Sequence, residues 1–342
     1  MTPAPPAPPG PAPARSEPAP RSVAEAATRL ASLLLGVPSP TVGDPRERDL
    51  VFEPAPGPRP LARGQAPVET WAVDGGQGLV ADARCLQVVV TRAARVCFAG
   101  GRCRREDEGE LRAWLLGAGF EREAVARLGL GVDPGAGVDV NLLRDAGEWE
   151  AVAACVEEAA PGSLVLLDGD LRADLRIPAA TVAAVLARAE ARGVAVAAVT
   201  KHSSLSRGGV PLVGHLEVTA TALLGPRSRW WAPVARAAPA LGYDVTVAVA
   251  RLDPDAHFAF RVDVGPGADV EAVLGALAAT CDDAAFCGYP YPLAVADRLA
   301  ACPGWLRHDV WLEVEERLAA AGVEPGVRER AFADRHGLLE RA

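Results

Sequence analysis

Short apolar runs alternate with longer amphipathic segments along most of this chain. The short runs end at glycine, proline or aspartate, which is typical of strands buried in a sheet. They predict strands at residues 71–74, 78–80, 86–91, 164–167, 194–200, 210–216, 244–252 and 258–264. Helical spacing of apolar residues predicts helices at 23–36, 106–129, 142–159, 179–192, 270–280 and 292–301, and a charged helical tail at 309–342.

The order of these elements indicates the fold class. The first three strands suggest an antiparallel meander. The strand–helix–strand segment at 164–200 implies a parallel pair joined by a right-handed crossover. A Rossmann fold fits less well, because no Gly-x-Gly-x-x-Gly motif opens a helix after the first strand. We therefore expect an α/β protein with an RNase H-like mixed sheet flanked by peripheral helices.

Composition divides the chain into four parts. Residues 1–22 are rich in Pro and Ala and should form a disordered tail, and 23–67 should form a helix and a Pro/Gly-rich linker. Residues 68–305 hold the predicted strands and should form the main domain, followed by a helical tail at 306–342. The leucines of the first helix could dock a partner, form a dimer contact or pack on their own domain.

Two predicted strands end in an aspartate that is followed by glycine, at Asp74 and at Asp168. Such an aspartate lies at the open edge of a sheet, where the glycine lets a ligand approach the backbone closely. If the two strands are neighbours, the paired carboxylates can hold Mg²⁺ or Mn²⁺, as in many enzymes that act on phosphates. Either aspartate alone could instead close an Asx-turn or cap a helix.

A third acid is expected on the helix predicted at 142–159. Glu148 lies one turn from Val152, at the edge of the apolar stripe of this helix, whereas Glu150 shares its face with Glu157. This spacing favours Glu148 as the inward-facing acid. The choice between Glu148 and Glu150 stays open, because both could be solvated surface glutamates.

Lys201 ends the strand predicted at 194–200 and is the only lysine among 35 basic residues. Where a composition replaces lysine with arginine almost everywhere, a retained lysine suggests a need for a compact ammonium. At a strand end this ammonium could contact a scissile phosphate or a leaving oxygen. Chance survival of one lysine is the alternative.

Residues 288–293 read Gly-Tyr-Pro-Tyr-Pro-Leu, and two prolines fix the backbone of this segment. Tyr289 and Tyr291 are therefore displayed rigidly, and Pro292 can begin a helix that carries Asp297 in its second turn. A tyrosine hydroxyl and a carboxylate brought near a metal would be reasonable. The alternative is that the tyrosines pack in the core.

Composition and charge restrict the location of the protein and the kinds of surface it can have. Half of the 342 residues are hydrophobic, yet there is no uncharged apolar run long enough for a transmembrane helix. Seven cysteines without a Cys-x-x-Cys pair, and a start without an apolar signal core, fit a reducing cytoplasm. The net charge of −9 argues against a surface that coats DNA, but it permits an acidic metal site with local basic patches.

One arginine-rich stretch could be a solvated hairpin edge or contact phosphates: Arg84, Arg92, Arg95, Arg102, Arg104 and Arg105.

Taken in order, these motifs resemble the NurA nucleases over about residues 71–301. The resemblance rests on the strand ends at Asp74 and Asp168, a helix acid between them, Thr-Lys-His-Ser at 200–203 and the segment at 288–293. It implies that 68–305 is a NurA-like nuclease domain with an RNase H-like core. It also implies a homodimer with Mn²⁺-dependent 5′→3′ exonuclease and single-strand endonuclease activity on DNA. The implied partner is HerA, a hexameric DNA-translocating ATPase, in end resection or defence.

The resemblance also implies roles for individual residues. By position, Asp74, Glu148 and Asp168 would be ligands of two Mn²⁺ ions, or alternatively Mg²⁺, with Tyr289 beside them. The family often has histidine where this chain has Asp297, which retains affinity for a hard cation but not the proton chemistry of histidine. Lys201 would neutralise charge on the phosphate. Arg298 and the arginines of 84–105 would guide the DNA strand, and Tyr289 or Tyr291 would stack on a base.

Two other interpretations remain. Leu-Leu-Asp-Gly-Asp at 166–170 has the strand-DxD form of haloacid-dehalogenase-type phosphatases, although that motif normally opens a domain. In such a phosphatase Asp168 would be the nucleophile and Asp170 the acid/base. Lys201 would bind the phosphate, and Asp282 and Asp283 would be the metal ligands. The other interpretation is a non-catalytic adaptor that docks a motor and holds DNA. The retained acids and lysine speak against it.

Overall fold

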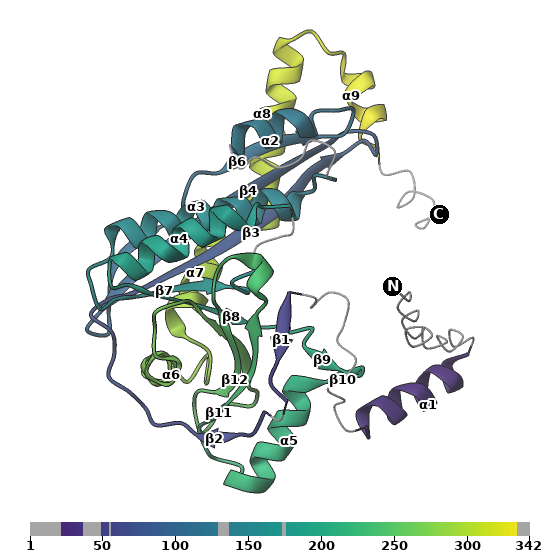
Figure 1. Cartoon of the computed structure of the whole chain (residues 1–342). Helices are drawn as coiled ribbons and strands as arrows, with labels where there is room; N and C mark the ends of the chain where they lie inside the picture. Colours follow the sequence, from purple (N-terminus) through teal and green to yellow (C-terminus); the bar gives the residue numbers. More distant parts are fainter. Residues whose placement is uncertain (1–21, 37–48, 55, 129–136, 173–175, 334–342) are drawn as a thin grey trace, which may run out of the picture.

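The computed structural model describes residues 22–36, 49–54, 56–128, 137–172 and 176–333 (Figure 1), so the predicted tail at 1–22 lies outside it except for Ser22. The strands are β1 (Leu50–Phe52), β2 (Arg59–Pro60), β3 (Thr70–Asp82), β4 (Gln87–Ala99), β5 (Arg102–Asp107), β6 (Arg112–Leu116), β7 (Leu164–Asp168), β8 (Ala195–Thr200), β9 (Ser206–Arg207), β10 (Val210–Pro211), β11 (Trp230–Ala237), β12 (Thr246–Arg251) and β13 (Phe260–Val264). The helices are α1 (Val23–Leu34), α2 (Glu121–Leu128), α3 (Val140–Glu158), α4 (Ala179–Ala191), α5 (Leu212–Leu224), the 3₁₀ turn η2 (Pro239–Leu241), α6 (Val270–Ala278), α7 (Tyr291–Ala300), α8 (Gly304–Ala320) and α9 (Pro325–Ala331).

One mixed sheet of 11 strands organises the described part of the chain. Its order is β1-β11-β12-β13-β8-β7-β3-β4-β5, with β2 paired to β11 and β6 paired to β4. Strands β3, β7 and β8 run parallel at its centre, and the other pairs are antiparallel. The expected mixed sheet flanked by helices is therefore confirmed.

Helices cover both faces of the central strands (Figure 1). Alternate residues of each strand point to opposite faces, so Val73 packs in the core under α3 and α4, while Ala72 packs in the core under α6 and α7. Burial on both faces explains why β7 reads as a continuous apolar run, Leu164–Leu167, before its final aspartate.

Three expectations about the elements are wrong. The helix predicted at 106–129 is helical only in its second half, as α2, while its first half contains the end of β5 and all of β6, which both pair with β4. The strand predicted at 210–216 is instead the short β10 followed by α5, because a short apolar run does not separate a strand from a buried helix. The separate strand predicted at 78–80 is the continuation of the 13-residue β3, of which 12 residues pair with β4.

Several elements were not predicted. Strands β1 and β2 lie in the expected linker, and β11 joins them to the sheet. The expected C-terminal helical segment is present as α8 and α9, while residues 334–342 lie outside the described residues. Among the described residues, no helix combines the length and apolar character needed to cross a bilayer.

Glycines in β3 allow α7 to approach the strand closely. A Cβ at Gly76 would lie 1.7 Å from the carbonyl oxygen of Ala300, a backbone atom that cannot move without shifting the end of α7. We expect Gly76→Ala to lower the free energy of unfolding by about 1–3 kcal/mol, measured by urea unfolding. Gly214→Ala is the control, because its Cβ would meet nothing within 4 Å and alanine favours the α5 helix. Equal stability of the two variants would contradict this packing.

Candidate metal centre

The strand register brings Asp74 and Asp168 together. Strands β3 and β7 pair in parallel up to Val73 and Leu167, so the next residue on each strand is one of the two aspartates. Asp168 is the last residue of β7, and Asp74 is only 8% exposed. The two carboxylates are therefore neighbours at the end of the β3–β7 pairing. Asp168 ends its strand as predicted, but Asp74 lies inside β3, which continues to Asp82 along β4, so the prediction that Asp74 ends a strand is wrong.

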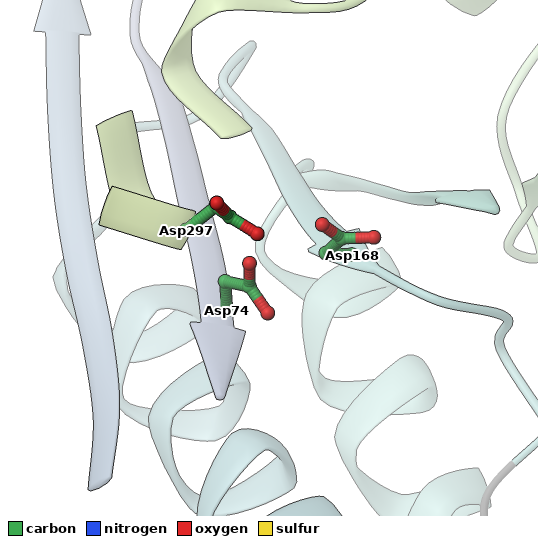
Figure 2. Close-up of side chains that lie close together, drawn as sticks. All are labelled: Asp74, Asp168 and Asp297. Atoms are coloured by element: carbon green, nitrogen blue, oxygen red, sulfur yellow. The ribbon is translucent and has the colours of Figure 1, made fainter. Parts of the chain in front are cut away.

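A third carboxylate comes from α7, which packs against β3 and β4. One oxygen each from Asp74, Asp168 and Asp297 lies within 4.8 Å of the others, and Figure 2 shows the three side chains turned toward one another. Three hard oxygen donors suit Mn²⁺ or Mg²⁺ better than soft metals, so this donor set fits the expected ions.

Lys201 bridges two of these acids. Its Nζ lies 2.6 Å from Oδ2 of Asp168 and 2.8 Å from Oδ1 of Asp297. Partial burial disfavours the charge on Lys201, but the hydrogen bonds to both carboxylates outweigh this effect and raise its pKa above the usual value. The side chain therefore places a permanent positive charge at the edge of the acidic cluster.

Tyr289 contacts the same oxygen of Asp168 as Lys201 does. Its hydroxyl donates a hydrogen bond to Oδ2 of Asp168 at 2.9 Å, and burial followed by the charge of Asp168 raises its pKa. The ring is only 7% exposed and packs on Phe260. Tyr291 turns away and meets Phe98 edge to face at 5.0 Å. The ring of Tyr289 is thus enclosed, whereas Tyr291 is partly exposed, and stacking of a base on Tyr291 stays a prediction.

Of the two candidate glutamates on α3, Glu148 is the one beside the cluster. It is 6% exposed and lies so close to β3 that a Cβ on Gly75 would be 2.2 Å from its Oε1. Nε of Arg144 is 3.2 Å from this same oxygen. Glu150 points elsewhere and pairs with Arg112 at 2.7 Å. The residue after Asp74 must therefore be glycine for Glu148 to keep this position.

Crowding of acids changes their protonation. Burial, with the charges of Asp168 and Glu148, raises the pKa of Asp74 to about 9. Burial is also the main reason that the pKa of Glu148 rises to about 8, although Arg144 opposes the shift. Both folded-state values lie above the ordinary carboxyl range, so the metal-free protein should lose stability as pH rises from about 4 through about 9.

A divalent cation should reverse this trend. Metal binding needs ionised carboxylates, so protons compete with the ion at low pH and compete less at high pH. We expect Mn²⁺ to raise the Tm more at about pH 8.5 than at about pH 6, measured by thermal unfolding with and without the ion. An Asp74→Asn protein is the control, and its Mn²⁺-induced rise in Tm should differ little between the two pH values. A shift that is equal at both pH values would contradict a metal site at Asp74.

The arginine-rich stretch is largely occupied by internal contacts. Arg92 donates to the backbone carbonyls of Ala300 and Ala301 at the end of α7. Arg95 pairs with Glu158 at 2.8 Å and with Asp107 at 2.7 Å, and Arg105 contacts the same two acids. These three arginines therefore stabilise the fold, which weakens the expectation that they contact phosphate. Arg298 is exposed on α7, next to Asp297.

The arrangement needed for a haloacid-dehalogenase site is not formed. Asp282 pairs with Arg63 at 2.6 Å, and Asp283 is exposed outside the acidic cluster. Asp170 lies 3.4 Å from the guanidinium of Arg261. The proposed metal pair and acid/base are thus engaged elsewhere.

Two features near the centre were missed in the sequence. Arg144 precedes Glu148 by four residues, a helical spacing that could have revealed the pair. Arg261 and Asp263 form a buried ion pair on β13, and Asp263 accepts the backbone N–H of Leu171 at 3.1 Å. Their alternation within an apolar strand is the signal that could have identified them.

Comparisons with known proteins identify the fold. No protein-family model matches the chain, and no curated protein is similar to it in sequence. The crystal structure of the NurA nuclease from Sulfolobus solfataricus is similar, with a TM-score of 0.57 and 15% identity over 87% of this chain and 95% of that chain. The chain therefore has a NurA-like fold.

Two further similarities are weaker. A second crystal structure of NurA has a TM-score of 0.43 and 8% identity, over 71% of this chain and 86% of that chain. The catalytic domain of human endonuclease V has a TM-score of 0.39 and 14% identity, over 78% of this chain and 92% of that chain.

Proposed function

We propose that this protein is a metal-dependent DNA nuclease. The observation that carries the proposal is the convergence of Asp74, Asp168 and Asp297 from three elements, with Lys201 between two of them. The NurA-like fold supports it, because the similar protein from Sulfolobus solfataricus is described as a nuclease.

The residues of the cluster have complementary roles. Asp74, Asp168 and Asp297, with Glu148 beside them, would hold Mn²⁺ or Mg²⁺, as two ions. A cation bound there supplies Lewis-acid activation of a phosphodiester and of the attacking water. Lys201 offsets the negative charge that develops on the phosphate. Tyr289 keeps Asp168 in one orientation by the hydrogen bond to its Oδ2.

The finer activity follows the family resemblance. We propose 5′→3′ exonuclease and single-strand endonuclease activity by a cytoplasmic homodimer, in end resection or defence. The sequence contains no Walker A motif. Any energy for movement along DNA would therefore come from a partner, for which we propose a HerA-type hexameric ATPase.

The test is cleavage of end-labelled single- and double-stranded DNA with Mn²⁺, Mg²⁺ or EDTA. We expect degradation with a divalent ion and none with EDTA, because the carboxylates alone supply no electrophile. An Asp168→Asn protein purified in the same way controls for contaminating nuclease. Hydrolysis of a small phosphate monoester without DNA cleavage would favour the phosphatase. DNA binding without cleavage, even with a HerA-type partner added, would favour the adaptor.

A further inference from the structure

A buried ion pair lies two strands away from Asp168. Arg261 and Asp263 belong to β13, which is separated from β7 by β8. The guanidinium of Arg261 binds both carboxylate oxygens of Asp263, at 2.7 Å and 2.8 Å. A buried ion pair is often no more stabilising than two apolar residues of similar volume, because the desolvation of its charges offsets their attraction. Stability alone therefore does not explain why charged residues stand here.

The register of the sheet explains how Asp263 can act across β8. Ala198 on β8 is paired with Asp263 on one side and with Leu167 on the other, so the three side chains lie on the same face. Ala198 is fully buried and carries only a methyl group. The carboxylate of Asp263 can therefore extend over β8 to the chain that leaves the end of β7.

Both members of the pair contact the segment that follows Asp168. Oδ2 of Asp263 accepts the backbone N–H of Leu171 at 3.1 Å, and a guanidinium nitrogen of Arg261 lies 3.4 Å from Oδ2 of Asp170. Because Leu171 is fully buried, its N–H depends on an acceptor within the protein. The ion pair thus fixes the chain two and three residues beyond Asp168.

Gly169 joins Asp168 to this fixed segment. Its φ of +136° lies in a region that L side chains rarely adopt, so the backbone turns sharply directly after the metal ligand. Its N–H donates to the carbonyl of Val199 at 3.1 Å, and its carbonyl accepts a hydrogen bond from Oγ1 of Thr200 at 2.5 Å. Contacts with β8 and β13 therefore hold every residue from 169 to 171, which leaves the backbone of Asp168 little freedom to turn.

We propose that Arg261 and Asp263 are positioning residues of the metal centre. Through the segment at 169–171 they hold Asp168 in the orientation that binds the cation, a role that rests on the metal-dependent nuclease function proposed above. A ligand that is already in place loses less conformational freedom when the ion binds, so its affinity is higher. Because the pair acts through the backbone, its removal should change metal affinity rather than the chemical step.

The test compares two double variants of the full-length protein that remove both charges together. Arg261→Met with Asp263→Leu removes the contacts to Asp170 and Leu171. Arg261→Met with Asp263→Asn keeps an amide oxygen that can accept the N–H of Leu171. Neither variant leaves a lone buried charge, so both should fold, which urea unfolding checks. Calorimetric titration measures the binding of Mn²⁺.

The double variant with leucine should bind Mn²⁺ about tenfold or more weakly than the wild type, and the one with asparagine within about threefold. Leucine should be at least as stable as asparagine at this site, because a buried amide leaves donors without partners. The order of metal affinity should therefore be opposite to the order of stability, which a merely structural role does not produce. Cleavage by the leucine variant should be slow at low Mn²⁺ and recover at high Mn²⁺, with KM for DNA unchanged.

A milder variant covers the case in which the double variants do not fold. Arg261→Lys keeps a positive charge beside Asp263, but an ammonium lacks the planar fork that binds both oxygens of Asp263 and also reaches Asp170. Its affinity for Mn²⁺ should fall about threefold or more. Arg236→Lys, at the exposed pair with Asp244, is the control and should keep the wild-type affinity.

The outcomes separate this role from the nuclease function. Wild-type Mn²⁺ affinity in the leucine variant, or in Arg261→Lys if the double variants do not fold, overturns the positioning role and leaves the nuclease function intact. Affinity that falls only in step with stability in the two double variants also overturns it. A wild-type protein that neither binds Mn²⁺ nor cleaves DNA overturns the nuclease function and the positioning role together.

Discussion

Asp168→Asn is expected to slow metal-dependent DNA cleavage by about 10³-fold or more. A catalytic metal site contributes several kcal/mol of transition-state stabilisation, and each factor of ten in rate corresponds to about 1.4 kcal/mol. Asparagine has the size of aspartate and can still accept the hydrogen bond from Tyr289. It lacks the negative charge that would bind a cation and that pairs with Lys201 at 2.6 Å. Single-turnover cleavage of labelled DNA measures the effect.

Lys201→Met separates metal binding from chemistry at the same carboxylate. This variant removes the ammonium but keeps the three acids, so the rise in Tm caused by Mn²⁺ should persist while cleavage slows. Asp168→Asn should lose both the rise in Tm and the cleavage. If Asp168→Asn cleaves DNA within about tenfold of the wild-type rate, the acidic cluster is not the catalytic centre.

Arg261→Met is expected to lower the free energy of unfolding by about 3–5 kcal/mol, because it leaves a buried carboxylate without its partner. Arg261 and Asp263 are 1% and 0% exposed, with Nε of the arginine 2.7 Å from Oδ1 of the aspartate. Burial raises the pKa of Asp263, and Arg261 opposes this shift. In the variant the opposing effect of Arg261 is lost, so burial raises the pKa of Asp263 further and the loss of stability should grow as pH rises. Urea unfolding at two pH values measures it.

An exposed ion pair provides the control for this prediction. Arg236 lies 2.9 Å from Asp244 with both side chains more than half exposed, so Arg236→Met should change stability by no more than about 1 kcal/mol. A similarly small effect of Arg261→Met would show that the buried pair does not stabilise the fold. Because Asp263 also accepts the N–H of Leu171, the Arg261 variant should loosen the segment that follows Asp168.

The local pattern of the sequence was sufficient to identify the central elements. Apolar runs that end in Asp-Gly placed Asp168 correctly at the end of β7, and the strand–helix–strand segment implied the parallel pair that β7 and β8 form. The same pattern located Asp74 on a strand but wrongly ended that strand there, because β3 continues to Asp82. These features depend on neighbouring residues alone, namely side-chain alternation, glycine at a turn and a helix long enough for a crossover.

Elements whose stability comes from distant partners were missed or misassigned. Strand β11 contains Pro233, which argues against a strand by local rules, but a register shift beside the proline accommodates it. In β6 the alternation of buried Trp114 and Leu116 is masked by the exposed, apolar Leu115 between them. Strand β5 is mostly exposed and shows no alternation at all.

The candidate site was likewise predictable from the sequence only in part. The sequence by itself determined which residue types follow the two apolar strand segments, stand on the helix and form the proline-fixed tyrosine segment, because those positions follow from local backbone geometry. The tertiary structure alone decided that Glu148 rather than Glu150 meets Gly75, and that the exposed Asp297 faces Asp74. The physical reason is that a helix offers several faces to its surroundings, and only packing of α3 and α7 against β3 selects the face that turns toward the acids.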